Sequence, residues 1–260
     1  MYDEPPFGIL GYEEKCWDES RFREVPLLIP MDTMISIIIP VMNEAALIVQ
    51  VLTTLQPLRA AGHELIVVDG DSEDDTRALS EPLSDRLIRS PFGRSRQMNA
   101  GARVAIGEIL LFLHADTFLP EGADRMIVEG MKRQGKSWGR FDVQLSGNHF
   151  FLRIIEWLMN WRSRLTGIAT GDQGIFVQRH LLETVGGFPD IDLMEDIALS
   201  NILKMYDRPI CLRQRVLTSS RRWEEKGILR TILLMWRLRL SYFLGSDPRR
   251  LAQIYERLRG

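Results

Sequence analysis

Short, uninterrupted runs of apolar residues recur along the chain, and polar or acidic residues follow each run. Three such runs lie within residues 35–40, 64–69 and 109–113. Runs of this length and composition are typical of strands buried on both faces of a parallel sheet. The central run, at 109–113, is followed directly by His114 and, two positions later, by Asp116. The pattern predicts an α/β sheet whose polar residues gather where the strands end.

Segments with helical spacing separate these strands. A helix predicted over 45–58 joins the first two strands, and this order indicates a right-handed βαβ unit. Further strands are predicted at 87–88, 138–143 and 175–177, and further helices at 93–107, 121–134, 149–165, 179–185, from 194 onward, 227–243 and 251–258. The predicted fold class is therefore an α/β/α sandwich with a mostly parallel central sheet and a C-terminal helical segment.

Acidic residues stand at the ends of two predicted strands. Asp69 ends the second run, and Asp116 comes shortly after the central run. A charge at this place is costly unless it faces a cleft, and open α/β sheets bind ligands at the carboxyl ends of their strands. Asp116 is therefore a candidate ligand for a divalent cation and, through it, for a phosphate. The alternative is that Asp116 only caps the loop before Pro120.

The loops after the first two strands allow two interpretations each. Asn43 suits the N-cap of the following helix and Glu44 its first turn, or the loop binds a polar ligand. Gly70 lets the backbone turn sharply beside Asp71. The nearby Asp74 and Asp75 lack the spacing of an EF-hand, so we interpret them as charges at a helix start.

Later segments add basic and acidic candidates. Arg94 and Arg96 precede or open a helix, where they suit phosphate binding, with surface salt bridges as the alternative. The glycine-flanked loop at 169–174 indicates a close backbone approach. The adjacent carboxylates of Glu195 and Asp196 stand at a helix start, either as dipole partners or with one acting as a general base.

Composition limits the class of protein. The 260 residues suffice for one large α/β domain or two small ones, and the net charge of −2 gives no bias toward nucleic acid. Two cysteines, Cys16 and Cys211, form no disulfide framework, which favours a reducing, cytoplasmic location. We expect no signal peptide, because the first 30 residues are acidic and rich in proline. No apolar stretch reaches the roughly 20 residues needed to span a bilayer.

The charges are unevenly distributed. Residues 1–34 carry eight acidic and three basic side chains, whereas residues 211–260 carry twelve basic and four acidic ones. The basic segment predicts contact with anionic phosphates or with a membrane surface, with a solvated helix face as the alternative. The strongly apolar helix at 149–165 is explained by core packing or by membrane contact.

Five of these motifs, spread over residues 34–225, resemble those of the family-2 glycosyltransferases. The strand at 37–40 with Asn43 and Glu44 resembles the opening strand and nucleotide loop of that family. Residues 68–72 resemble the second motif, whose leading Asp holds the nucleotide base. Residues 113–116 occupy the place of the Asp-any-Asp motif, with His114 instead of the first Asp. The remaining two resemblances are Glu195-Asp196, to the late Glu-Asp pair, and Arg222-Trp223, to the closing Arg-Trp pair.

The resemblance implies a GT-A fold and an inverting transfer of a sugar from a nucleotide-diphosphate sugar to an acceptor hydroxyl. Asp196 would be the general base, and Mg²⁺ or Mn²⁺ the cofactor, held by Asp116 with His114. The donor site would comprise Pro40, Asn43, Glu44, Asp69, Asp71, Arg94 and Ala115. The acceptor site would comprise Gly171, Asp172, Gln173, Glu195, Arg222 and Trp223. The acceptor would be a lipid or a saccharide.

Two other classes remain open. A nucleotidyltransferase acting on sugar phosphates usually has a glycine-rich, basic loop after its first strand, and residues 41–44 contain neither glycine nor lysine. A non-catalytic, membrane-associated nucleotide-binding protein would use the helices at 149–165 and 227–243. We expect a loosely structured extension over 1–33, a catalytic domain over 34–225 and basic amphipathic helices over 226–260, with peripheral contact at the cytoplasmic membrane face.

Overall fold

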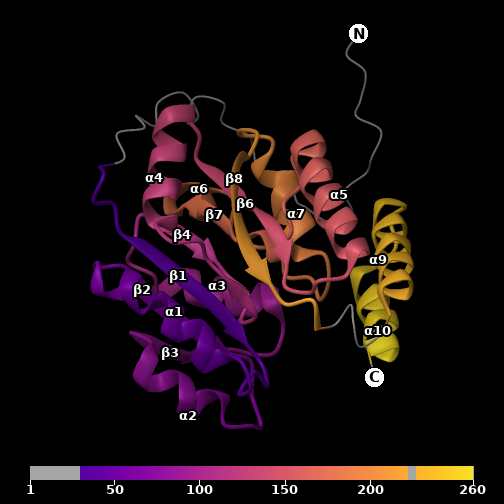
Figure 1. The fold of residues 1–260 in the computed structure, drawn as a ribbon, viewed down its shortest axis with the longest axis horizontal. Coiled ribbons are helices and arrows are strands. Elements are labelled where there is room, and N and C mark those ends of the chain that lie inside the picture. Colours follow the sequence, from indigo (N-terminus) through magenta and orange to yellow (C-terminus); the bar gives the residue numbers. More distant parts are fainter. Residues whose placement is uncertain (1–29, 222–226, 260) are drawn as a thin grey trace.

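The computed structural model describes residues 30–221 and 227–259, and its main feature is one eight-stranded sheet in the order β3-β2-β1-β4-β7-β6-β8-β5 (Figure 1). The expectations for residues 1–29, and for Arg222 and Trp223, lie outside the described residues. The strands are β1 (Ile35–Val41), β2 (Glu64–Asp69), β3 (Arg86–Arg89), β4 (Ile109–Phe112), β5 (Thr117–Phe118), β6 (Trp138–Leu145), β7 (Ile175–Gln178) and β8 (Ile210–Thr218).

The strand directions agree with the predicted mostly parallel sheet, and three antiparallel pairs add to it. Strands β3, β2, β1 and β4 are mutually parallel, and β6 is parallel to β8. The antiparallel pairs are β4 with β7, β7 with β6, and β8 with β5. The carboxyl ends of β1, β2 and β4 therefore lie at the same edge, where the candidate residues follow them.

Helices cover both faces of the sheet. They are α1 (Ile48–Ala60), α2 (Thr76–Ser80), α3 (Arg94–Val104), α4 (Ala123–Gln134), α5 (Phe150–Thr166), α6 (Arg179–Thr184), α7 (Glu195–Leu203), α9 (Ile228–Phe243) and α10 (Pro248–Arg259), with 3₁₀ turns η2 (Glu81–Leu83) and η3 (Gly171–Gln173). These positions match the predicted helices closely.

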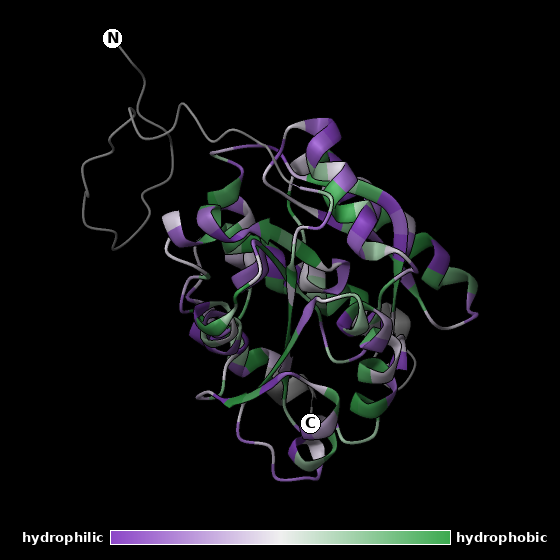
Figure 2. Cartoon of the chain, turned by 90° about the vertical axis from the view of Figure 1, so that its left-hand side faces the viewer, coloured by the Kyte–Doolittle hydropathy of each residue, from purple (hydrophilic) through white to green (hydrophobic). Residues whose placement is uncertain are grey.

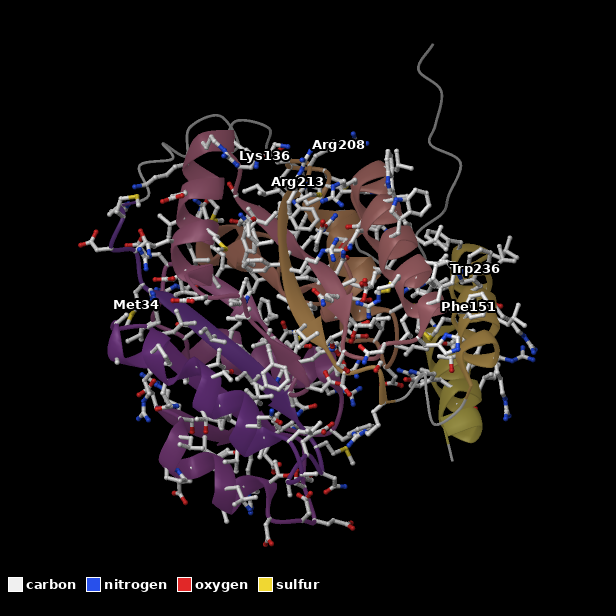
Figure 3. All side chains as sticks on the ribbon, in the orientation of Figure 1. Met34, Lys136, Phe151, Arg208, Arg213 and Trp236 are labelled. Carbon is white, nitrogen blue, oxygen red and sulfur yellow. The ribbon has the colours of Figure 1, made fainter. Side chains whose placement is uncertain are left out.

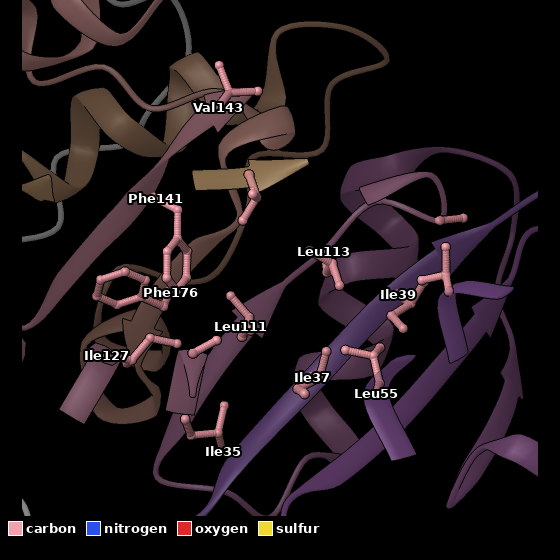
Figure 4. Packing of buried hydrophobic residues seen from close by; sticks show 14 of the residues in the cluster. Ile35, Ile37, Ile39, Leu55, Leu111, Leu113, Ile127, Phe141, Val143 and Phe176 are labelled. Carbon is pink, nitrogen blue, oxygen red and sulfur yellow. The ribbon is translucent and has the colours of Figure 1, made fainter. Parts of the chain in front are cut away.

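The core has two layers because side chains alternate along the strands. Ile37 and Ile39 of β1 pack with α1, α4 and α5 on one face, whereas Ile38 packs with α3, α6 and α7 on the other. Figure 4 shows part of the first layer, where Leu111 lies among residues from several strands. Figure 2 shows hydrophobic residues along the central strands. Burial on both faces explains why these strands read as continuous apolar runs.

Two features differ from the sequence-based expectations. Strand β8 was not predicted, because its polar residues Arg213, Gln214 and Arg215 interrupt the apolar pattern with exposed side chains. Helix α1 begins at Ile48 with Leu47 as its N-cap residue, so the prediction of Asn43 as the N-cap is wrong.

The C-terminal helices pack against the segment that precedes and begins α7. Leu238 of α9 and Leu251 of α10 are buried with Ile168, Met194 and Ile197. Helix α9 lies beside α5 in Figure 1. Within residues 30–221 and 227–259, no helix combines the length and the apolar character that a membrane span requires.

Candidate functional site

The loops after β1 and β2 are joined by hydrogen bonds. The backbone N–H of Asn43 donates to Ser72 Oγ (3.0 Å), and the Asn43 side-chain oxygen accepts from the backbone N–H of Glu73 (2.8 Å). The backbone N–H of Glu44 donates to Thr76 Oγ1 (2.8 Å). Asn43 therefore connects two loops, and this connection replaces its predicted role as a helix cap.

Asp69 lies fully buried at the end of β2. Its carboxylate accepts from the backbone N–H of Ser72, at 3.2 and 3.3 Å from the two oxygens, and Arg77 Nε lies 3.7 Å from Oδ2. A buried carboxylate requires such partners because its desolvation is costly. The contacts fix Asp69 beside the joined loops.

Gln97 of α3 holds the ends of β1 and β2 together, a role that the sequence analysis missed. Its buried amide nitrogen donates to the backbone carbonyls of Val41 and Val68, each at 2.8 Å. A Cβ at Gly70 would lie only 2.9 Å from this amide. The available signal was the spacing of Gln97 four positions before Gly101, which puts both on the sheet-facing side of the helix.

A second cluster joins three segments that lie far apart in the sequence. His114 Nδ1 is 3.2 Å from Asp172 Oδ1, and the backbone N–H of Gly171 donates to Asp196 Oδ2 over 2.9 Å. A Cβ at Gly171 would collide with His114 Nε2. The close approach predicted for the 169–174 loop is therefore an approach to His114, and it requires glycine.

Asp116 faces a cavity while its backbone is tied to the end of β8. The backbone N–H of Ser219 donates to the carbonyl of Asp116 (3.1 Å), and Thr117 Oγ1 lies 3.4 Å from the Asp116 carboxylate. The neighbouring Thr117 also exchanges a hydroxyl hydrogen bond of 2.8 Å with Thr218. The strand that was not predicted thus positions the residue on which the sequence interpretation depends.

Backbone strain coincides with the candidate loops. Among the described non-glycine residues, those with a positive φ are Asn43 (54°), Asp71 (68°) and Met194 (69°). Each lies in a loop that carries a candidate residue, and Met194 directly precedes Glu195 and Asp196. Such conformations persist where surrounding contacts enforce them, and they gather at functional sites.

Charged groups around the start of α7 shift the pKa values of Glu195 and Arg94. Burial and then the Asp196 carboxylate raise the pKa of Glu195 to about 7, while Arg94 and His114 oppose the rise. Desolvation acts to lower the pKa of Arg94, but the carboxylates of Glu195, Asp172 and Asp116 raise it overall. Arg94 remains exposed, so solvent screens part of these interactions. Ionisable groups from four segments of the chain therefore act on one another.

A cavity of about 990 Å³ adjoins this cluster. Asp116 and Asp172 line it together with Thr218, and α5 and α9 supply most of the other walls. Residues of the joined β1 and β2 loops do not line this cavity. The described structure thus divides the candidate residues between a loop pair at β1 and β2 and a cavity at α5 and α9.

The donor set around Asp116 fits a metal that also binds substrate. No group of three or more His, Cys, Asp or Glu side chains within the described part of the chain is arranged to hold an ion. Mg²⁺ commonly uses one or two carboxylates plus substrate phosphates, so it needs no such cage. Both ring nitrogens of His114 face the 171–172 loop, which leaves the Asp116 carboxylate as the suitable ligand.

The other candidate residues lie as follows. Pro40 pairs with Val68 within the sheet, and Ala115 is buried. Gln173 is fully buried, and its amide serves the capping box of Thr170 and contacts Asn160, so it does not face the cavity. Arg96 forms ion pairs with Asp190 (2.8 Å) and Asp192 (3.5 Å), the alternative that the sequence left open.

Comparison with known sequences gives a family match. The family model "Glycosyl transferase family 2" matches residues 36–180. An uncharacterized protein of Mycobacterium tuberculosis is 34% identical over 99 residues, which cover 36% of this chain and 31% of that protein. A PGL/p-HBAD biosynthesis glycosyltransferase of Mycobacterium bovis is 38% identical over 95 residues, or 34% of this chain and 37% of that enzyme. The matched segment thus spans about a third of the length of these relatives.

Three solved structures share the fold. Staphylococcus aureus TarS 1–349 with UDP-GlcNAc has a TM-score of 0.59 at 17% identity, covering 72% of this chain and 58% of TarS 1–349. The mannosyltransferase PcManGT of Pyrobaculum calidifontis with GDP-Man and Mn²⁺ has a TM-score of 0.58 at 22% identity, covering 92% of this chain and 74% of PcManGT. Glucosyl-3-phosphoglycerate synthase of M. tuberculosis with Mn²⁺, UDP and glucosyl-3-phosphoglycerate has a TM-score of 0.51 at 18% identity, covering 72% of this chain and 71% of the synthase chain. The likeness confirms the expected GT-A fold.

Proposed function

The chain belongs to glycosyl transferase family 2, and we propose that it is an inverting enzyme with a nucleotide-diphosphate sugar as donor and a hydroxyl group as acceptor. The observation that carries the proposal is the cluster in which Gly171 joins Asp196 to the His114–Asp172 pair beside the Asp116 cavity. Family membership also argues against the nucleotidyltransferase alternative.

The donor nucleoside binds at the joined loops of β1 and β2. Pro40, Asn43 and Glu44 come from the first loop, and Asp69 and Asp71 from the second. The hydrogen bonds between the loops support this assignment, because they hold both sets of groups before any ligand arrives. Preorganised groups lose less entropy on binding.

Asp116 holds the divalent cation together with the donor diphosphate, and Arg94 faces the same phosphates. A bound Mg²⁺ or Mn²⁺ neutralises charge that builds on the leaving diphosphate. Arg94 interacts with Asp116 and Glu195, so it lies near the acidic cluster and suits an anion placed there. The related mannosyltransferase structure contains GDP-Man and Mn²⁺.

Asp196 takes the proton from the acceptor hydroxyl as that oxygen attacks the anomeric carbon. Its two oxygens accept from the backbone N–H groups of Gly171 (2.9 Å) and Ile197 (2.7 Å), which orient the carboxylate. Glu195, whose pKa is raised to about 7, stands beside it and contributes to the acceptor side. Gly171, which contacts Asp196, and the neighbouring Asp172 complete the acceptor side.

The test is a donor screen by thermal shift, followed by an assay of sugar release. Nucleotide sugars are tested with Mn²⁺ on the full chain, because a ligand of the folded state raises its melting temperature. We expect one donor class to stand out and Asp116→Asn to abolish its metal-dependent shift. Asp32→Asn, at an exposed residue before β1, is the matched control. A chain that binds no nucleotide sugar under these conditions contradicts the proposal.

We also propose that α5 and α9 contact a membrane surface. Both helices expose large apolar side chains, including Phe150 (71%), Trp157 (59%) and Trp236 (62%). Phe151 of α5 and Trp236 of α9 lie on the same side of the molecule (Figure 3). Arg230 and Arg237 of α9 add positive charge. Tryptophan and arginine together suit the headgroup region of an anionic membrane.

Flotation with phosphatidylglycerol vesicles tests this contact. The wild-type chain is expected to float, and Trp157→Ser with Trp236→Ser to remain at the bottom of the gradient. Substitution of Met205, which is exposed after α7, to Ser is the matched control. Flotation that is equal in all three proteins would disprove the contact.

A further inference from the structure

Two arginines on facing walls of the large cavity have buried N–H groups without a partner. The Nε and Nη2 atoms of Arg162, on α5, and the Nε atom of Arg239, on α9, are buried and donate no hydrogen bond to any described residue. A buried donor on a charged group costs free energy when it is left unpaired. Such groups need an explanation, and a bound anion supplies one.

The charges around Arg162 favour the same explanation. Desolvation and then the positive charge of Arg239 lower the pKa of Arg162 to about 10, and Arg140 of β6 acts in the same direction. Asp196 of α7 and Asp172 oppose this effect. Both carboxylates already have partners, since Asp196 accepts from Gly171 and Asp172 lies beside His114. Two like charges in a poorly solvated place are stabilised by an anion between them.

Three unpaired guanidinium nitrogens match a phosphoryl group better than a carboxylate. A phosphoryl group offers three acceptor oxygens and up to two negative charges, and guanidinium groups bind such oxygens in paired geometry. A carboxylate has two oxygens, which a single guanidinium group can occupy. The two arginines together therefore fit one phosphoryl group.

Most of the remaining cavity wall is apolar, although Arg221, Arg230 and Arg237 also line it. Ile155, Leu158 and Met159 of α5 face it, as do Leu240 and Phe243 of α9. Apolar walls with a few convergent polar groups are characteristic of sites for amphiphilic ligands. Because Asp116 and Asp172 also line this cavity, a ligand bound there adjoins the proposed reaction centre.

We propose that the acceptor is an amphiphile that carries a phosphoryl group, with the phosphoryl oxygens bound by Arg162 and Arg239 and the apolar part between α5 and α9. This inference rests on the proposed function, since it names the acceptor class of the same site. The donor diphosphate is assigned to Asp116 and Arg94, so Arg162 serves a different phosphate.

Calorimetry with decyl phosphate, kept below its micellar concentration, tests the site on the full chain. We expect Arg162→Gln and Arg239→Gln each to weaken binding about 10- to 100-fold, the range for a lost hydrogen bond to a charged group. Arg162→Lys keeps the charge but loses the paired geometry, so its affinity for decyl phosphate should lie between those of the wild type and Arg162→Gln. Arg103→Gln, at an exposed position of α3, is the matched control for net charge.

Two comparison ligands separate the parts of the site. Inorganic phosphate lacks the apolar part and decyl glucoside lacks the phosphoryl group, so both should bind more weakly than decyl phosphate. Equal binding of decyl glucoside, or unchanged binding of decyl phosphate by Arg162→Gln, would overturn the proposal. Competition by phosphatidic-acid vesicles would identify a lipid as the source of the phosphoryl group. If the vesicles do not compete, the source is a water-soluble amphiphile.

A parallel titration with UDP and Mn²⁺ distinguishes this inference from the proposed function. Arg162→Gln should keep the nucleotide affinity of the wild type. If it loses both ligands, Arg162 binds the donor diphosphate and the acceptor assignment is overturned. If the wild-type chain binds decyl phosphate through Arg162 but no nucleotide sugar, the proposed function fails and the phosphoryl site remains.

Discussion

The backbone N–H of Gly171 donates a hydrogen bond to Asp196 Oδ2 over 2.9 Å. This contact joins the 169–174 loop to the start of α7, although 25 positions separate the two residues in sequence. Together with the backbone N–H of Ile197, which donates to Oδ1, it fixes the position of the Asp196 carboxylate.

Replacement of Asp196 by Asn should lower turnover by about 10²- to 10⁴-fold, because a general base contributes roughly that factor. The amide keeps an oxygen for the Gly171 contact, so the loop geometry and nucleotide binding should survive. Steady-state kinetics and a nucleotide titration measure both effects. Turnover equal to that of the wild type would exclude Asp196 as the base.

Gly171→Ala should disrupt the cluster for a steric reason. The added methyl group collides with the His114 ring, and overpacking of this kind costs about 1–3 kcal/mol. His114→Ala in the same chain should restore part of the lost stability, because it removes the colliding ring. Urea unfolding of the single and double variants measures the coupling. Additive effects would show that the collision does not determine the loss.

The raised pKa of Glu195 predicts a pH dependence of stability. Its pKa rises from 4.5 to about 7 in the folded chain. The folded state therefore binds more protons than the unfolded state between these values, and the free energy of unfolding falls as the pH rises through this window. The loss amounts to about 3 kcal/mol at most.

Unfolding at pH 5 and pH 8 measures this effect. Glu195→Gln is expected to show a smaller difference between the two pH values than the wild type, since it has no proton to lose. Glu121→Gln, at an exposed residue before α4, should behave as the wild type. Equal slopes in all three proteins would contradict the assignment.

Gln97→Met should destabilise the fold by about 2 kcal/mol, because the carbonyls of Val41 and Val68 each lose a donor. The same change should weaken nucleotide binding, since these carbonyls fix the ends of β1 and β2. Chemical denaturation and a UDP titration give the two values. Asn99 lies on the same helix and its amide donates to the carbonyl of Phe188. Asn99→Met therefore controls for the loss of a side-chain amide alone.

Arg162→Met should stabilise the unliganded chain by about 1–3 kcal/mol, because it removes a buried cation with two unpaired N–H groups. The same variant should gain no stability from decyl phosphate. Thermal melts with and without the ligand measure both. A lower melting temperature without ligand would show that Arg162 has a structural role.

The fold was predictable where apolar runs are continuous. Strands β1, β2 and β4 are buried on both faces, so their sequence carries a strong signal. Strand β8 exposes Arg213, Gln214 and Arg215, and its pairing with β6 depends on residues far away in sequence. The spacing of apolar residues within one segment cannot predict a pairing between two strands that lie far apart in sequence.

The acidic residues of the candidate site could be predicted from the sequence, whereas the residues that hold or surround them could not. Asp116 and Asp196 follow from motifs, because strand ends and helix starts are visible in the sequence. The roles of Gln97 and Arg162 follow only from packing, which brings Gln97 onto two carbonyls and leaves Arg162 without a partner. Asn43 is a residue type common at N-caps, and its positive φ and its hydrogen bonds to the second loop become visible only in the structure.

The packing of α9 and α10 on Met194 and Ile197 has an evolutionary consequence. The β1 and β2 loops, to which we assign the donor nucleoside, do not line the cavity, whereas the cavity takes one of its walls from α9. Exchange of the C-terminal tail alone could therefore change which molecule is glycosylated while the donor stays the same. A family built in this way can diversify its products by recombination at a single junction.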